Sequence, residues 1–92
     1  MDTILLRDNT DRHRFELDVE GYVAFADYRR QDGRLAITHV ETPVALRGGG
    51  VADKVMRGVV AQARREGLTV TPLCSYAAAW FQRHPDERDL LG

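Results

Sequence analysis

Three side chains in this sequence could carry out acid-base or nucleophilic chemistry, and each lies where a strand is predicted to end. His39 and Glu41 are two residues apart, and Cys74 is the only cysteine of the chain. A histidine titrates near neutral pH, a carboxylate in a desolvated cleft has a raised pKa, and a thiol at a helix start can act as a nucleophile. Each also has a structural explanation: Glu41 as a solvated acid, His39 as a packed and hydrogen-bonded residue, and Cys74 as a small buried hydrophobe.

A run of glycines between a predicted strand and a predicted helix is the element most suited to binding a ligand. Gly48, Gly49 and Gly50 follow Arg47 and precede Val51-Ala52. Glycines allow a close approach of the backbone, and a helix start without a Ser, Thr, Asp or Asn cap leaves its N–H groups free for an anion. The alternative is a flexible turn in which glycine is simply the helix cap. Arg47 favours the anion site, because it adds a cation.

The first half of the chain predicts strands. A short strand is predicted at residues 4–6, and alternating apolar and acidic residues at 15–20 predict a half-buried strand. Aromatic and β-branched residues at 22–29 predict another, and Asp32-Gly33 predicts a hairpin turn into a strand at 34–42. Unless a bulge shifts the phase, one face of that last strand carries Leu35, Ile37, His39 and Glu41.

The second half predicts a helix, a strand and a helix. Apolar residues at helical spacing from Val51 to Ala63 predict an amphipathic helix that ends at Gly67. A strand follows at 68–74, and because its Pro72 cannot donate a ladder hydrogen bond, the strand lies at an edge or parts from its neighbour there. A short helix then begins with Ser75 as its cap and ends before a proline, and residues 86–92 read as a polar tail. The pattern predicts one α+β domain over residues 1–92, an antiparallel meander followed by helix-strand-helix.

Composition narrows the classes of partner. The chain has 92 residues, 43% of them hydrophobic, and a net charge of -1, which gives no electrostatic reason to expect nucleic acid or an anionic membrane as partner. A single cysteine favours a reducing compartment, so the cytoplasm is the expected location, and no apolar run is long enough to span a bilayer. The histidines and the cysteine lack the spacing of metal ligands, so no metal is expected. A chain this small is expected to be a monomer or a homodimer.

The glycine turn resembles the acyl-CoA-binding motif of the GNAT superfamily of N-acetyltransferases, Q/R-x-x-G-x-G/A, with Arg47, Gly50 and Ala52 at its defined positions. Three further runs extend the resemblance over nearly the whole chain. Together they are similar to a minimal single-domain GNAT family of about this length, described as predicted acetyltransferases of unknown substrate. The runs are Thr38-His39-Val40-Glu41-Thr42-Pro43, Thr71-Pro72-Leu73-Cys74-Ser75 and Arg83-His84-Pro85.

The resemblance implies acetyl-CoA as co-substrate and an amine of unknown identity, on a small molecule or a protein, as acceptor. The pyrophosphate of acetyl-CoA would lie on the amides of Gly48, Gly49, Gly50, Val51 and Ala52 beside Arg47. Its pantetheine arm would run in a cleft between splayed strands, along Val40, Glu41 and Thr42. The expected cofactor site also takes in Cys74, Ser75 and Arg83.

The resemblance also implies direct attack of the amine, with Glu41 where many members keep a general base and His39 nearby. Cys74 is expected to line the site, and an acetyl-cysteine route is the less usual alternative. Trp80 and Phe81 stand where many larger members carry a tyrosine that protonates the departing thiolate, and Tyr76 is expected to pack at the helix start. The rival hypothesis is a non-catalytic module that binds acetyl-CoA or CoA, or that contacts a protein.

Overall fold

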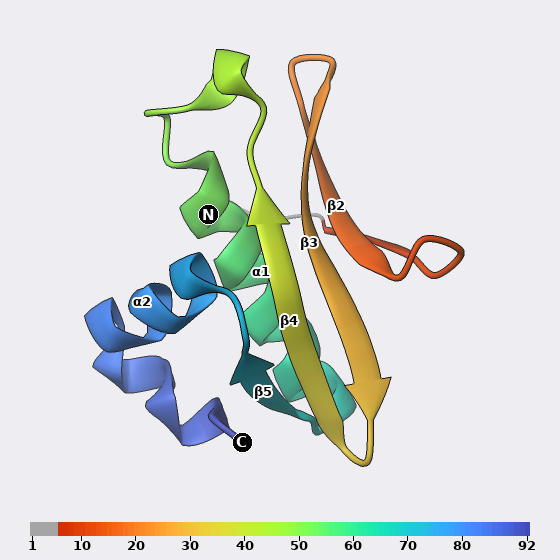
Figure 1. Ribbon diagram of the computed structural model, residues 1–92, viewed down its shortest axis with the longest axis vertical. Coiled ribbons are helices and arrows are strands. Elements are labelled where there is room, and N and C mark those ends of the chain that lie inside the picture. Colours follow the sequence, from red (N-terminus) through yellow and green to blue (C-terminus); the bar gives the residue numbers. More distant parts are fainter. Residues whose placement is uncertain (1–5) are drawn as a thin grey trace.

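A computed structural model describes residues 6–92. In this part of the chain the protein consists of a five-stranded sheet and two α-helices, with short 3-10 segments (Figure 1). The sheet order is β1-β2-β3-β4-β5, in which the first four strands form an antiparallel meander and β5 joins β4 in parallel. Residues 4 and 5 of the predicted first strand lie outside the described residues, and the observed β1 begins after Leu6. The strands are β1 (Arg7–Asn9), β2 (Arg14–Val19), β3 (Tyr22–Gln31), β4 (Arg34–Glu41) and β5 (Thr69–Pro72).

The helices follow the predicted pattern, with two differences near the end of the chain. Gly67 ends α1 in the left-handed conformation at φ 70°, as predicted. The cap of α2 is Cys74 and not Ser75, because the Cys74 sulfur accepts the N–H of Ala77 at 3.4 Å. The predicted polar tail is a 3-10 helix whose Leu90 is buried. The helical segments are η1 (Val44–Leu46), α1 (Val51–Glu66), α2 (Ser75–Arg83) and η2 (Pro85–Leu90).

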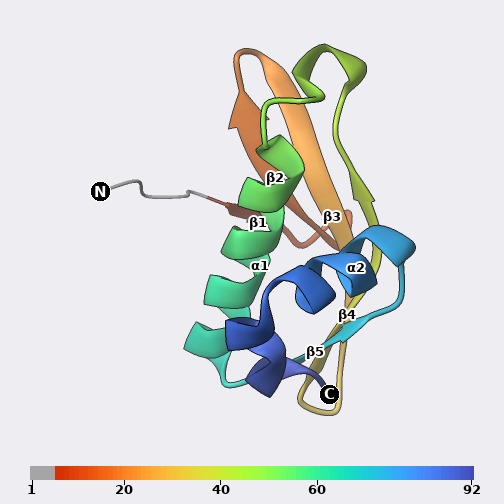
Figure 2. The ribbon, with the colours of Figure 1, turned by 90° about the vertical axis from the view of Figure 1, so that its left-hand side faces the viewer.

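The core lies between the sheet and α1, and the arrangement follows from the apolar face of that helix (Figure 2). Alternate residues of β2, β3 and β4 point toward α1, as the strand period of two requires. Helix α2 lies beside α1 against β4 and β5 and contributes three buried residues. Within the described part of the chain, no helix is long and apolar enough to cross a membrane. The largest fully buried side chains are Trp80, Phe15, Phe81, Leu35, Ile37, Met56, Val55, Val59 and Val70.

Strand β4 carries an irregularity that decides which of its side chains face the core. In the pairing of β3 with β4, Asp27 is opposite His39 and Tyr28 is opposite Ile37, so Thr38 is an extra residue. This bulge resets the alternation, and Val40 rather than His39 packs against the core after Ile37. The predicted shared face of Ile37, His39 and Glu41 is therefore wrong beyond the bulge.

The parallel ladder between β4 and β5 is short. It pairs Arg34 to Ile37 with Thr69 to Pro72, and the N–H groups of Leu73 and Cys74 then both donate to the Ile37 carbonyl. Pro72 thus lies in an edge strand at the last residue of the ladder, as its missing N–H predicts. Among residues 6–92, none continues this ladder along the end of β4.

Candidate functional site

The glycine turn leaves the first N–H groups of α1 without a cap. Gly48 and Gly50 have φ values of 86° and 76°, in the left-handed region that favours glycine. Gly50 is the N-cap residue of α1, and no side chain caps the helix at this end within the described residues. Gly49 differs from its neighbours, because its N–H donates to the Leu46 carbonyl at 3.4 Å. The free amides and the positive end of the helix dipole together favour an anion.

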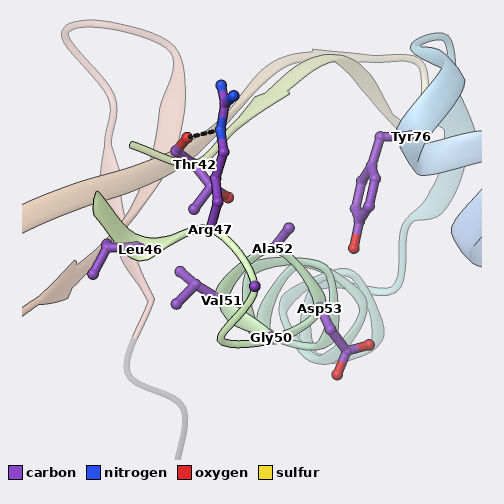
Figure 3. Close-up of a pocket in the computed structure, with 9 residues that line it drawn as sticks. Thr42, Leu46, Arg47, Gly50, Val51, Ala52, Asp53 and Tyr76 are labelled. Carbon is purple, nitrogen blue, oxygen red and sulfur yellow. Dashed lines mark hydrogen bonds between the residues drawn. The ribbon is translucent and has the colours of Figure 1, made fainter. Parts of the chain in front are cut away.

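A pocket of about 170 Å³ opens directly over this turn (Figure 3). The Arg47 side chain stands at its edge and donates from Nε to the Thr42 carbonyl at 3.3 Å. Tyr76 points from α2 toward the first turn of α1. The pocket is therefore closed by three separate segments: the end of β4, the turn into α1, and the start of α2. Its lining residues are Thr42, Leu46, Arg47, Gly48, Gly50, Val51, Ala52, Asp53 and Tyr76.

A second pocket, of about 420 Å³, continues from the first along the end of β4. The two pockets share four lining residues, so they form adjacent parts of one surface. The hydroxyl oxygen of Thr42, one of the four, is buried and has no hydrogen-bond partner among the described residues. A buried polar atom without a partner is uncommon in folded proteins and is often satisfied by a ligand or water. The second pocket is lined by His39, Val40, Glu41, Thr42, Arg47, Ala52 and Tyr76.

His39 and Glu41 form a pair at the open side of the second pocket. His39 Nε2 lies 3.3 Å from Glu41 Oε1, and each side chain is about half exposed, at 53% and 52%. The bulge at Thr38 places them on the face of the sheet away from α1. Such a pair is accessible from solvent. Its carboxylate or imidazole can take a proton from a bound group and release it to water.

Tyr76 is the functional candidate that sequence reasoning missed. It was expected to pack at the helix start, but it lines both pockets and lies beside the glycine turn. Burial raises the pKa of its hydroxyl above the ordinary value, although Arg83, whose guanidinium carbon lies 5.8 Å from the ring centroid, opposes the shift. The shift favours the neutral phenol, which is also the form of an ordinary tyrosine at neutral pH. The sequence signal was only its place in the first turn after β5, which cannot show which way the ring points.

Four predicted site residues do not line these pockets, namely Gly49, Cys74, Ser75 and Arg83. The Cys74 sulfur is occupied as the cap of α2, Ser75 is exposed in the first turn of that helix, and Arg83 is exposed in its last turn. Arg83 is nevertheless oriented toward the Tyr76 ring. The structure thus brings together predicted residues from the end of β4 and from the glycine turn. Helix α2 reaches the two pockets through Tyr76, and none of the residues predicted there lines them.

An acidic residue, Asp53, also lies in the wall of the first pocket. Burial alone would raise the pKa of its carboxyl, but hydrogen bonds from Arg57 and Trp80 outweigh this and lower the pKa. The carboxylate points away from the glycine turn (Figure 3). In the part of the chain that the structure describes, no three His, Cys, Asp or Glu side chains are grouped as a metal site would require.

Comparisons with known proteins identify one family by sequence and one shared fold by structure. The model of the family described as GCN5-related N-acetyl-transferase matches residues 14–90. The NMR solution structure of a GCN5-like candidate N-acetyltransferase from Staphylococcus aureus superposes with a TM-score of 0.70. That alignment covers 100% of this chain and 91% of the other, at 23% sequence identity, and shows that the two share a fold. No curated protein sequence matches the chain.

Proposed function

The chain belongs to the GCN5-related N-acetyltransferase family, and from this premise we propose that it transfers an acetyl group from acetyl-CoA to an amine. One observation carries the proposal: uncapped amides at the start of α1 open into a pocket that continues along the end of β4. This surface suits a ligand such as acetyl-CoA, which has an anionic pyrophosphate followed by an extended pantetheine arm. We place the reaction in the cytoplasm, because a lone free cysteine suits a reducing compartment.

The residues present suit acetyl-CoA. The free N–H groups of Gly48, Gly50, Val51 and Ala52 would hold the pyrophosphate, and the guanidinium of Arg47 adds a cation at the pocket edge. The partnerless Thr42 hydroxyl lies where the two pockets meet, and it gives the arm a hydrogen-bonding group. When bound, acetyl-CoA supplies an activated thioester. The end of β4, where no described residue continues the ladder, leaves backbone groups for the arm to pair with.

Proton transfers fall to the residues at the two sides of the second pocket. The acceptor amine must lose a proton, and the carboxylate of Glu41, with His39 at 3.3 Å, is placed to take it directly or through water. The departing thiolate must gain one, and the Tyr76 hydroxyl, which lines both pockets and is protonated at neutral pH as phenols are, would give it. Base and acid thus come from opposite walls, β4 and α2.

We further propose direct attack of the amine without an acetyl-cysteine. The Cys74 sulfur accepts the N–H of Ala77 and caps α2, which gives this thiol a structural task. Its side chain lines neither of the two pockets described above. Both observations favour Tyr76 over Cys74 as the group of α2 that takes part in the reaction.

Two measurements test the proposal. In a titration of the ¹⁵N-labelled protein with CoA, we expect shifts of the amide signals of Gly48, Gly50, Val51 and Ala52. The absence of shifts at millimolar ligand contradicts the site. Incubation with acetyl-CoA and a panel of small amines and lysine peptides should release CoA above the hydrolysis blank. Binding without acceptor-dependent release across the panel supports instead the alternative, a module that binds acetyl-CoA without catalysis.

A further inference from the structure

Asp53 is an acid in the wall of a pocket that is otherwise suited to anions. It is the third residue of α1, and its side chain is 36% exposed. A carboxylate in the first turn of a helix is attracted to the helix N-terminus, and from the third position it can reach back to the N–H of the cap residue, here Gly50. A carboxylate in that place would satisfy an amide and repel a phosphate.

The structure holds this carboxylate elsewhere. Trp80 Nε1 donates to Asp53 Oδ1 at 2.8 Å, and Arg57 Nε donates to Oδ2 at 2.7 Å. His84 stacks on the Trp80 ring with centroids 3.9 Å apart, its Nδ1 lies 2.7 Å from the Trp80 carbonyl oxygen, and its Nε2 lies 3.6 Å from Asp53 Oδ1. Both oxygens are therefore engaged. The carboxylate points away from the glycine turn, as Figure 3 shows.

The indole that engages Asp53 is firmly fixed. Trp80 is 1% exposed and packs edge-to-face against Phe81 at 5.2 Å between centroids. Its N–H is a donor that needs a partner once buried, and Asp53 provides it. Since Trp80 and Tyr76 lie one turn apart on α2, the same hydrogen bond ties the helix that carries Tyr76 to the first turn of α1.

We propose that Trp80 and Asp53 form a clamp that keeps the phosphate site open, an inference that rests on the proposed function. The indole N–H withdraws the Asp53 carboxylate from the free amides of its own helix, so that these remain available to the pyrophosphate. The same bond holds α2, with Tyr76, against the glycine turn. Asp53 is in this sense a positioning residue, and its charge is tolerated in an anion site because its oxygens are bound elsewhere.

Four proteins test the clamp: wild type, Trp80→Phe, Asp53→Ala and the double variant, each titrated calorimetrically with CoA. Trp80→Phe frees Oδ1 of Asp53 to compete with the phosphate, while Arg57 still donates to Oδ2, and we expect CoA affinity to fall about tenfold, or about 1.4 kcal/mol. Asp53→Ala removes the competing carboxylate together with the hydrogen bond to Trp80, so its affinity is the reference against which the double variant is compared. The double variant should recover to the affinity of Asp53→Ala. A double variant as weak as Trp80→Phe overturns the clamp.

A control and a second replacement separate the clamp from a loss of packing. Phe81→Leu also removes aromatic packing from α2 but no hydrogen bond to Asp53, so adding Asp53→Ala to it should change CoA affinity by the same factor as adding Asp53→Ala to wild type. Where Trp80→Phe does not fold by circular dichroism, Trp80 is replaced by β-(3-benzothienyl)alanine, which keeps the fused ring but has sulfur in place of the N–H. The same weakening and the same recovery with Asp53→Ala are expected; unchanged affinity refutes the clamp.

The outcomes also distinguish the clamp from the proposed function. A wild-type protein that does not bind CoA contradicts the proposed function itself. A wild-type protein that binds CoA, but whose Trp80 variants are not rescued by Asp53→Ala, contradicts only the clamp.

Discussion

Replacing Gly50 by alanine tests the glycine turn, and Gly67→Ala at the other end of α1 is its matched control. The two glycines have nearly the same backbone conformation, φ 76° and 70°, and an added Cβ meets no atom within 4 Å at either position. The change therefore costs only the left-handed conformation, about 1–2 kcal/mol for an L residue. Alanine also restricts the unfolded chain, which returns about 0.4–1 kcal/mol. We expect a net loss of about 0.5–1 kcal/mol in each, or about 2–8 °C in Tm.

We expect Gly50→Ala and Gly67→Ala to differ in CoA affinity although they lose the same thermal stability. Gly50 lines the first pocket, so we expect a methyl group there to obstruct the close approach of a phosphate, whereas Gly67 lies at the far end of the helix. Loss of one charge-assisted hydrogen bond corresponds to about tenfold in affinity or more. Thermal unfolding and CoA titration of both variants measure the two effects. Equal losses of affinity in both, or full affinity in Gly50→Ala, refute an anion site at this helix start.

Three further predictions follow from other contacts of the site and the fold. Tyr76→Phe keeps the ring and should leave CoA affinity unchanged while lowering turnover about 100-fold, as expected for loss of a general acid; unchanged turnover excludes that role. Cys74→Ala removes the cap of Ala77 N–H and should lower the unfolding free energy by about 1 kcal/mol, whereas Cys74→Ser caps equally well and should keep both stability and transfer. An inactive but stable Cys74→Ser protein would instead support an acetyl-cysteine. The hydrogen bonds from Arg30 hold the pKa of Glu66 below its ordinary value, so this stabilisation is present at neutral pH and is lost as pH falls through the lowered pKa. Melting of Glu66→Gln between about pH 6 and pH 3 should therefore depend less on pH than that of wild type, and equal slopes contradict the assignment.

Much of the fold could be predicted from the sequence because local chemistry decided it. The alternation after Phe15 indicated a strand, although Glu16 on its acidic face is buried as well. Gly67 marked a helix end that requires positive φ, and Pro72 indicated an edge. Each of these signals lies within a few residues and has one strong physical cause. The family resemblance rested on motifs at the same elements.

The remainder depended on contacts between distant segments. The extra residue Thr38 follows from the pairing of β4 with β3, so the sequence could allow for a bulge but could not place it, and the faces of His39 and Glu41 were misassigned. The choice between Cys74 and Ser75 as helix cap is a difference of one residue that only the backbone geometry settles. The direction of Tyr76 depends on how α2 docks on α1, and no local pattern encodes that.

The short ladder between β4 and β5 has a consequence for the order in which this protein folds. Its partners are separated in the chain by the whole of α1, so closing them costs more entropy than closing any of the hairpins of the meander. We expect β5 and α2 to be the last elements to assemble and the first to open, with faster amide hydrogen exchange than β2 and β3. Both pockets are lined by Tyr76 of α2, the helix that directly follows β5. A ligand at about 100 times its Kd, which stabilises a protein by about 2.7 kcal/mol, should therefore slow exchange most in β5 and α2.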